Sequence, residues 1–350
     1  MKAKRKTAVF SKTLAVISSF FILFTLVGCQ MNNSRPFSKQ DFVMDTVLTQ
    51  IIYPGNDLDA EIAQEALEIL KKAEKKLSAF DENSEISRVN ASEGKSVEVS
   101  QETFEIVKSA LEYARQSDFL FDISVLPVSS IWKTAIKDQK LPDDSKIQSA
   151  KKLVDGSKIV LDEEKRSITL EKGMGIDLGA CAKGAALASV KKLYDEKEVS
   201  GAICSLGGSA MLLYGNKNGQ DFKIGLKNPF DSKAQESFAI LSLSDCVVST
   251  SGGYERFAEI NGEIYHHIID IKTGYPAKND VAFATVVGSD GVFCDYMSTR
   301  LFLEGFENAC ALAQKNEIAA VIVSQDKKVF VSNSLSHRLE IADGSFERIG

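Results

Sequence analysis

The chain has few of the residues that most often bind zinc or form covalent cross-links. Only three of its 350 residues are histidines, and its six cysteines include no C-x-x-C pair. An odd number of cysteines follows Cys29, namely Cys181, Cys204, Cys246, Cys294 and Cys310. The sequence therefore indicates neither a zinc site nor a disulfide framework, and we expect these five cysteines to be small core residues.

Positive charge is also scarce once the first 28 residues are set aside. That segment holds five of the 42 basic residues and none of the 48 acidic ones, so the remaining chain carries 37 basic and 48 acidic residues, a net charge of −11. Proteins that bind nucleic acids usually present a basic face to the phosphates. We therefore expect no nucleic-acid partner.

The apolar run at the N-terminus is too short to span a membrane. It covers residues 14–27, whereas a spanning helix needs about 20 residues. Five basic residues precede or border it, and it ends in Leu26-Val27-Gly28-Cys29, which matches a bacterial lipoprotein cleavage box. We therefore expect a signal peptide over 1–28, a lipid on Cys29 and an extracytoplasmic protein anchored to the bacterial cell membrane; an uncleaved signal anchor would leave the compartment unchanged.

The remaining chain predicts one domain of mixed secondary structure. Residues 29–38 are polar and are typical of a tether, so the domain is assigned to 39–350. Apolar spacing predicts helices over 57–80, 103–115, 183–196 and 295–316, the last with a break at Gly305. Short runs of strand-forming residues are found at 167–170, 202–206, 222–226, 239–243, 282–287, 319–323 and 329–331. Helices and strands without strict alternation predict an α+β fold with mixed sheets and packed helices.

A glycine-rich junction at 175–184 runs from an apolar strand end into a helix. Such a junction exposes backbone N–H groups that suit phosphate oxygens, although its glycine spacing is neither a dinucleotide fingerprint nor a P-loop. Lys183 lies near the helix start, where a cation opposes the helix dipole. An anionic ligand would resolve that conflict, and a simple tight turn is the alternative.

Asp295 and Thr299 are placed at the start of a predicted helix, four residues apart and therefore on one face. Carboxylate and hydroxyl oxygens are ligands that Mg²⁺ accepts. The alternative is a carboxylate that only satisfies the helix dipole beside a surface threonine.

Three further segments contain residues suited to chemistry. In 265–276 two adjacent histidines occur on a predicted strand, whose alternation places His267, Ile269 and Ile271 on one face. Paired glycines at 206–209 and a hydroxyl run with glycines at 248–257 permit close approach of a ligand. Each signal is weak alone, and none resembles the nucleophile elbow of a serine hydrolase.

Taken in order, these segments resemble the ApbE family of flavin transferases, also called FAD:protein FMN transferases. The resemblance runs from about residue 44 to residue 305. Its motifs occur here at 44–46, 78–87, 121–127, 177–184, 206–209, 250–256, 267–276 and 295–299. The resemblance implies an ApbE-type, T-fold-like architecture.

The resemblance also implies roles for individual residues. Flavin contacts are implied for Met44, Phe80, Leu120, Phe121, Asp122, Asp177, Lys183 and Ile269, and Mg²⁺ ligands for the Ala180 carbonyl, Asp295 and Thr299. His267 and Lys183 are the candidates for proton transfer and for electrostatic contact. Phe80 replaces a tyrosine found in many members, Ile271 replaces a proline, and Ser298 stands where some members have an acidic ligand.

The implied reaction moves FMN from FAD to a threonine or serine hydroxyl of an exported acceptor protein and releases AMP. Membrane-associated electron-transfer proteins are the expected acceptors. Two alternatives stay open: an FAD pyrophosphatase that uses water in the same site, and a non-catalytic flavin-binding lipoprotein.

Overall fold

A computed structural model describes residues 35–231 and 237–349 of the chain. These residues belong to one unit, Ser34–Gly350. The predicted signal peptide and Cys29 lie outside the described residues. Within the described ranges, none of the helices combines the length and the apolar character needed to cross a membrane.

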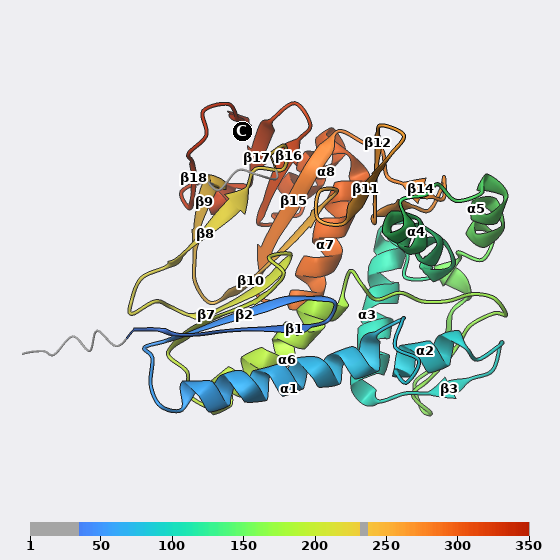
Figure 1. Cartoon of the computed structure of the whole chain (residues 1–350), viewed down its shortest axis with the longest axis horizontal. Helices are drawn as coiled ribbons and strands as arrows, with labels where there is room; N and C mark the ends of the chain where they lie inside the picture. Colours follow the sequence, from blue (N-terminus) through green and yellow to red (C-terminus); the bar gives the residue numbers. More distant parts are fainter. Residues whose placement is uncertain (1–34, 232–236, 350) are drawn as a thin grey trace, which may run out of the picture. The chain divides into compact units, whose positions relative to one another are not determined.

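A nine-stranded sheet forms the centre of the fold (Figure 1). Neighbouring strands pair antiparallel, except for the parallel pair at one edge. The strand β15 is buried along almost its whole length, which explains its nearly continuous apolar sequence. In spatial order the strands are β1 (Phe37–Val43), β2 (Thr46–Tyr53), β6 (Gly201–Leu206), β7 (Ala210–Gly215), β10 (Cys246–Gly252), β15 (Val281–Gly288), β16 (Ala320–Ser324), β17 (Lys328–Val331) and β19 (Glu347–Ile349).

Helices pack against this sheet and against one another. The helix α7 (Gly291–Glu304) lies along β10 and β15, α6 (Ala182–Glu196) contacts β7, and α1 (Asp59–Leu77) packs beside α6 (Figure 1). The largest apolar core fills the space between these elements and includes α3 (Gln101–Gln116). A second core joins the sheet to a three-stranded sheet made of β18 (Leu339–Ile341), β9 (Ser237–Leu243) and β8 (Phe222–Lys227).

The predicted helices and strands agree with the structure in type, and most boundaries shift by one to three residues. The break at Gly305 is confirmed, because α7 ends at Glu304 and α8 (Phe306–Lys315) begins directly after it. One boundary was wrong: α7 begins at Gly291, so Asp295 lies one turn inside the helix and not at its start. Asp290 is the N-cap, and its carboxylate accepts hydrogen bonds from the first turn.

A smaller helical region contains two helices that the sequence analysis did not assign, beside the strand that it expected within 265–276. The helices are α4 (Leu126–Asp138) and α5 (Asp144–Lys151). They pack against two strand pairs. One pair is β11 (Phe257–Ile260) and β12 (Glu263–His266), and the other is β13 (Ile269–Asp270) and β14 (Tyr275–Pro276). At its centre, Trp132 is fully buried and donates a hydrogen bond of 2.8 Å to the Gly274 carbonyl. This contact joins α4 to the turn that follows β13.

Other short elements complete the described chain. They are α2 (Glu85–Asn90), β3 (Val97–Glu98), β4 (Val160–Asp162), β5 (Ser167–Thr169) and the 3₁₀ helices η1 (Gly156–Lys158) and η2 (Asn333–Leu335). The strand β1 begins at Phe37, within the segment assigned to the tether. The five described cysteines are free; Cys181, Cys204 and Cys294 are buried, whereas Cys246 and Cys310 are half-buried.

The first turns of α6 and α7 meet at two glycines. A Cβ atom built on Gly184 would lie 1.9 Å from the Gly291 carbonyl oxygen, and one on Gly291 would lie 2.4 Å from the Gly184 carbonyl oxygen. Because any larger side chain would push the helices apart, this approach requires glycine at both positions. It brings the start of α6 against the part of α7 that carries Asp295.

We expect Gly184→Ala to lower the free energy of unfolding by more than about 2 kcal/mol, because the added methyl group meets backbone that cannot move aside. Urea denaturation monitored by circular dichroism measures the change. Gly344→Ala is the matched control, since a Cβ at Gly344 meets nothing within 4 Å. Equal stability of the two variants would contradict the close contact.

Candidate functional site

A cavity of about 860 Å³ opens between the sheet and the smaller helical region. Its walls contain every described residue that the sequence analysis assigned to flavin, metal or catalysis. These are Met44, Phe80, Leu120, Phe121, Asp122, Asp177, Ala180, Lys183, His267, Ile269, Asp295 and Thr299. Segments far apart in the sequence therefore converge on one site, and Cys29 lies outside the described residues.

Asp295 is buried where α6 and α7 meet, and both of its carboxylate oxygens accept hydrogen bonds. The Gly184 N–H donates to Oδ2 at 2.6 Å, and the Ser249 hydroxyl donates to Oδ1 at 2.6 Å. No side chain caps α6, so the Asp295 carboxylate supplies an acceptor and a negative charge at that helix N-terminus. Burial raises the pKa of Asp295, and the hydrogen bonds from Ser249 and Gly184 oppose that shift.

Three hydroxyl groups gather one turn further along α7. The Ser251 hydroxyl lies 2.9 Å from those of Ser298 and Thr299. Ser298 and Thr299 also donate to the Asp295 carbonyl, at 2.9 and 3.3 Å. Because alternate residues of a strand share a face, Ser249 and Ser251 of β10 both point toward α7. The strand thus supplies hydroxyls on either side of the aspartate.

The oxygen atoms of these residues are suitable ligands for a small divalent cation. Carboxylate, hydroxyl and carbonyl oxygens are the ligands that Mg²⁺ prefers, and Asp295, Thr299 and Ala180 all line the cavity. Within the described ranges no group of three or more His, Cys, Asp or Glu side chains is arranged to hold a metal. A cation here would depend on one carboxylate and neutral oxygens.

Lys183 projects from the first turn of α6 into the cavity. Its ammonium group donates to the Ser209 hydroxyl at 2.6 Å, which joins α6 to the glycine turn that follows β6. Burial lowers the pKa of Lys183, while the carboxylate of Glu255 opposes that shift. Burial in turn raises the pKa of Glu255. Lys183 and Glu255 therefore line the same cavity, and the pKa shifts disfavour the charged form of each side chain.

The two adjacent histidines have different environments. His266 is buried, and both of its ring nitrogens are engaged: Nε2–H donates to the Ala277 carbonyl at 2.9 Å, and Nδ1 accepts from the Ile268 N–H at 3.2 Å. This is a satisfied structural histidine, which leaves His267 as the one of the pair with a ring open to the cavity.

The tautomer of His267 follows from its partner. Its Nδ1 lies 3.3 Å from the Arg256 carbonyl oxygen, which only accepts hydrogen bonds, so Nδ1 carries the proton. The protein atoms packed around the ring lower the pKa of His267 to about 4, although the side chain keeps an exposed face, and the positive charge of Arg256 acts in the same direction. The ring is therefore neutral near pH 7, with an unprotonated Nε2 that is able to accept a proton.

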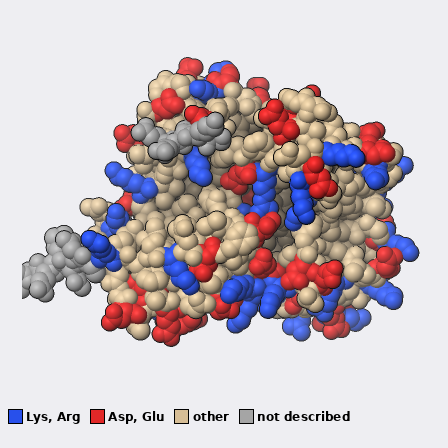
Figure 2. Space-filling model, in the orientation of Figure 1, with Lys and Arg blue, Asp and Glu red and all other residues tan. Residues whose placement is uncertain are grey.

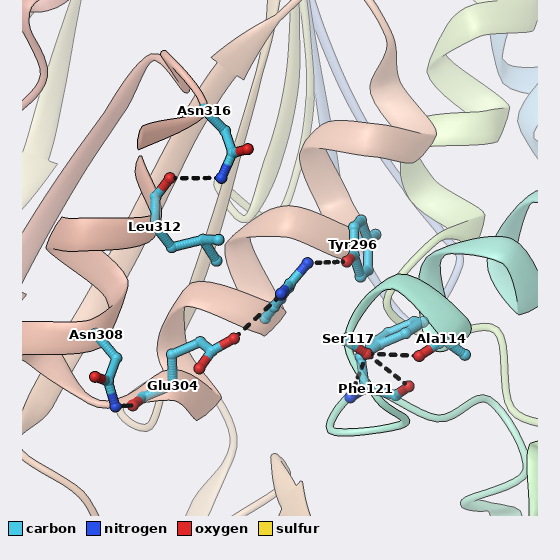
Figure 3. Close-up of polar contacts among 9 residues, drawn as sticks. Ala114, Ser117, Phe121, Tyr296, Glu304, Asn308, Leu312 and Asn316 are labelled. Atoms are coloured by element: carbon cyan, nitrogen blue, oxygen red, sulfur yellow. Dashed lines mark hydrogen bonds and ion pairs between the residues drawn. The ribbon is translucent and has the colours of Figure 1, made fainter. Parts of the chain in front are cut away.

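Aromatic packing forms the wall that carries Leu120 and Phe121. The Phe121 ring lies edge-on to Tyr296 with centroids 5.0 Å apart, and Tyr113 stacks on Tyr296 at 4.4 Å. The Tyr296 hydroxyl accepts a hydrogen bond of 3.0 Å from Arg300, which also pairs with Glu304 (Figure 3). The turn before Phe121 is held by the Ser117 hydroxyl, which contacts the Ala114 carbonyl and the Phe121 backbone (Figure 3).

Asp122 and Asp177 hold backbone segments of the cavity wall. Asp122 is buried, and its two oxygens accept N–H groups of Ser124 at 2.7 Å and Gly156 at 2.9 Å. Asp177 accepts from the Gly179 N–H at 2.9 Å and from the Ser129 hydroxyl at 3.0 Å. Both side chains line the cavity, and both also have a clear structural role.

At the cavity mouth, Phe80 is 48 % exposed and Lys133 lies over its ring, 3.5 Å from the centroid. Met44, in the turn between β1 and β2, also lines the cavity. The face shown in Figure 2 carries Lys and Arg side chains interspersed with Asp and Glu. The mouth thus combines aromatic surface with charges of both signs.

Several residues of the site were not assigned from the sequence. Ser249, Ser251 and Ser209 fell within the hydroxyl and glycine segments, but nothing in those patterns showed which hydroxyl faces Asp295 or Lys183. Arg256 ends the motif at 250–256, but no role was assigned to it. Ser129 lay in no assigned segment, because it acts through a contact to a residue distant in sequence. The expected strand face at 267–271 is only partly correct, because Ile268 also lines the cavity and β12 ends at His266.

Comparison with known proteins shows a match to the ApbE family over residues 44–322. The chain is 29 % identical over 322 residues to the FAD:protein FMN transferase of Klebsiella pneumoniae, covering 91 % of this chain and 99 % of that protein. It is 28 % identical to the transferase of the same name from Treponema pallidum, over 89 % of this chain and 91 % of that protein.

Solved structures show the same fold. The crystal structure of an ApbE protein from Thermotoga maritima matches with a TM-score of 0.79 at 26 % identity, covering 87 % of this chain and 99 % of that chain. The apo flavinyl transferase ApbE of Pseudomonas stutzeri matches with a TM-score of 0.74 at 22 % identity, over 87 % and 96 % of the two chains. The predicted mixed α+β architecture is therefore confirmed.

The environment of His267 predicts a pH dependence of stability. The unfolded chain takes up this proton near the ordinary histidine pKa of 6.5, whereas the folded protein does so only near 4. The free energy of unfolding should therefore fall as the pH decreases between these two values. Because His267→Gln removes the titration, its stability should fall less than that of the wild type between about pH 7 and about pH 4, as measured by urea denaturation. His337→Gln, at an exposed position outside the cavity, is the control; a wild-type pH dependence in His267→Gln would contradict the assignment.

Proposed function

The chain belongs to the ApbE family, and on that premise we propose that it is an enzyme that transfers FMN from FAD to other proteins. The observation that carries the proposal is the convergence of all twelve described candidate residues on one cavity. Its volume of about 860 Å³ is within the range of cavities that enclose small ligands and cofactors. Relatives that match nearly the whole chain are named FAD:protein FMN transferases.

The proposed reaction is an attack by a threonine or serine hydroxyl of the acceptor protein on the FMN phosphorus of FAD. The new bond joins the acceptor oxygen to that phosphorus, and the bond to the AMP phosphate breaks, so that AMP leaves. The proton of the attacking hydroxyl passes to Nε2 of His267. This assignment is supported by the open ring, the neutral state near pH 7 and the fixed tautomer.

Other residues of the chain bind and orient the substrate. Lys183 provides a positive charge beside the α6 N-terminus, an arrangement suited to phosphate oxygens. Phe80 and Phe121 offer aromatic faces of the kind on which a flavin ring stacks. These contacts would hold the phosphorus within reach of the acceptor hydroxyl, which is a large part of catalysis in phosphoryl transfer.

We assign the divalent cation, Mg²⁺, to the carboxylate of Asp295, the hydroxyl of Thr299 and the carbonyl of Ala180. The chemistry that such a cation supplies when bound is neutralisation of the charge that grows on the leaving phosphate. The burial of the carboxylate next to the hydroxyls of Ser298 and Thr299 supports this assignment. The Ser249 hydroxyl and the Gly184 N–H hold the carboxylate in place.

The acceptors are proposed to be exported proteins of membrane-associated electron transfer. This follows from the lipoprotein box that ends at Cys29, which predicts attachment to the outer face of the bacterial cell membrane. FAD would then have to reach the enzyme outside the cytoplasm.

The decisive experiment mixes the soluble form, FAD, Mg²⁺ and a candidate acceptor, and detects flavin fluorescence that survives a denaturing gel. The wild type should label the acceptor, and Asp295→Asn should lower the rate by about 10²- to 10³-fold. Mg²⁺ should raise the melting temperature of the wild type but not that of Asp295→Asn, which tests the cation site without turnover. Asp245→Asn is the control, because Asp245 is exposed and lies outside the cavity.

The products separate the alternatives. Free FMN and AMP without a labelled acceptor would identify an FAD pyrophosphatase and overturn the proposed transfer. FAD binding with neither product, for every acceptor supplied, would identify a flavin-binding protein without catalysis.

Cys29→Ser tests the proposed anchor. We expect the wild type to incorporate a radiolabelled fatty acid and to sediment with membranes, because stable attachment requires at least two acyl chains. Cys29→Ser should lose both properties and keep its transferase activity. Unchanged fatty-acid labelling of the variant would contradict lipidation at this residue, and Cys310→Ser is the matched control.

A further inference from the structure

We propose that Asp45 is a positioning residue that fastens the β1–β2 hairpin across the mouth of the cavity and thereby places Met44 and His267. This inference rests on the proposed transferase function. Its basis is a set of contacts, named here the clasp, that Asp45 makes with Arg256 and Lys133.

The hairpin tip has a backbone shape that needs support. Met44 and Asp45 join β1 to β2 in a two-residue turn, with φ angles of 53° and 58°. Such a turn matches the twist of paired strands, but glycine and asparagine are its preferred residues. A side chain as large as Met44 adopts positive φ at a cost. This cost suggests that the turn is selected for where it directs its side chains, and both line the cavity.

Asp45 joins the tip to two other walls of the cavity. Its carboxylate Oδ2 lies 3.5 Å from Nη1 of Arg256 and 3.9 Å from Nζ of Lys133. Arg256 also donates from Nη2 to the Asp45 carbonyl at 3.1 Å. Lys133 belongs to α4 and covers the Phe80 ring, and Arg256 lies between β10 and β11. The clasp therefore connects three chain segments around one opening.

The clasp continues to His267 through the backbone of Arg256. The carbonyl oxygen of Arg256 accepts the backbone N–H of His267 at 3.1 Å and its Nδ1–H at 3.3 Å. The side chain of Arg256 is held by Asp45 while its carbonyl fixes the histidine ring. Asp45 thus acts on His267 through Arg256, and on Met44 through the shared turn.

The strength of the clasp sets the size of the expected effect. The side chains of Asp45 and Arg256 are 64 % and 44 % exposed, and exposed ion pairs contribute little to folding stability and are screened by salt. Loss of the Asp45–Arg256 ion pair should therefore weaken substrate binding and orientation, and should change the melting temperature little.

Asp45→Asn tests the clasp with little backbone change, because asparagine tolerates positive φ and only the charge is lost. We expect the KM for FAD to rise about three- to tenfold at low ionic strength, with a smaller fall in kcat. In the wild type, added salt should raise the KM toward that of the variant. Asp245→Asn is the matched control, because Asp245 also has a positive φ of 46° and lies outside the cavity.

A double-mutant cycle identifies the partner. Arg256→Gln removes the charge and keeps the main-chain carbonyl that holds His267. If Asp45 acts through Arg256, the double variant should be little worse than Arg256→Gln alone. The proposal would be overturned if the effects of the two substitutions on the KM for FAD were fully additive. It would also be overturned if Asp45→Asn had the same KM as the wild type at every salt concentration.

FAD binding, measured by quenching of flavin fluorescence without an acceptor, separates this proposal from the proposed function. Failure of the wild type to label any acceptor would overturn transfer. The same binding series would still decide the clasp, since weaker binding in Asp45→Asn supports it and unchanged binding contradicts it.

Discussion

The site depends on the close contact between the first turns of α6 and α7. Two glycines, Gly184 and Gly291, allow the helices to approach so closely that the Gly184 N–H reaches the Asp295 carboxylate. A buried carboxylate needs partners, and here a helix N-terminus and the Ser249 hydroxyl provide them. If the helices were further apart, Asp295 would lose its main donor, and Lys183 of α6 would no longer face the same cavity.

Four ionisable groups of the cavity have charged forms that are disfavoured. Burial raises the pKa of Asp295 and Glu255 and lowers that of Lys183 and His267. Side chains with such shifted pKa values are common in ligand-binding sites, because a charged ligand stabilises the charged form of the side chain that it contacts. A cation beside the aspartate and an anionic diphosphate beside the lysine would satisfy both requirements, which is why the geometry suits a nucleotide substrate.

The sequence identified most of the candidate residues, but it did not decide between their structural and functional roles. Asp295 was weighed as a metal ligand or as a carboxylate that satisfies a helix dipole; it does satisfy one, that of α6 and not of its own helix. Strand alternation placed the two histidines on opposite faces, and the family resemblance favoured His267, but neither gave the partners of either ring. His266 is structural, because it is buried and both of its ring nitrogens have hydrogen-bond partners. In His267 the Arg256 carbonyl binds Nδ1–H and leaves Nε2 free.

By itself, the sequence determined the helices and strands with clear apolar periodicity, the break at Gly305 and the order of motifs that resembles the ApbE family. These features are local, since they depend on residues a few positions apart. Only the tertiary structure decided that α4 and α5 form a separate wall and that Asp45 meets Arg256. Those facts arise from contacts between residues up to about two hundred positions apart, which no local pattern encodes, because packing and hydrogen bonding select them only once the whole chain has folded.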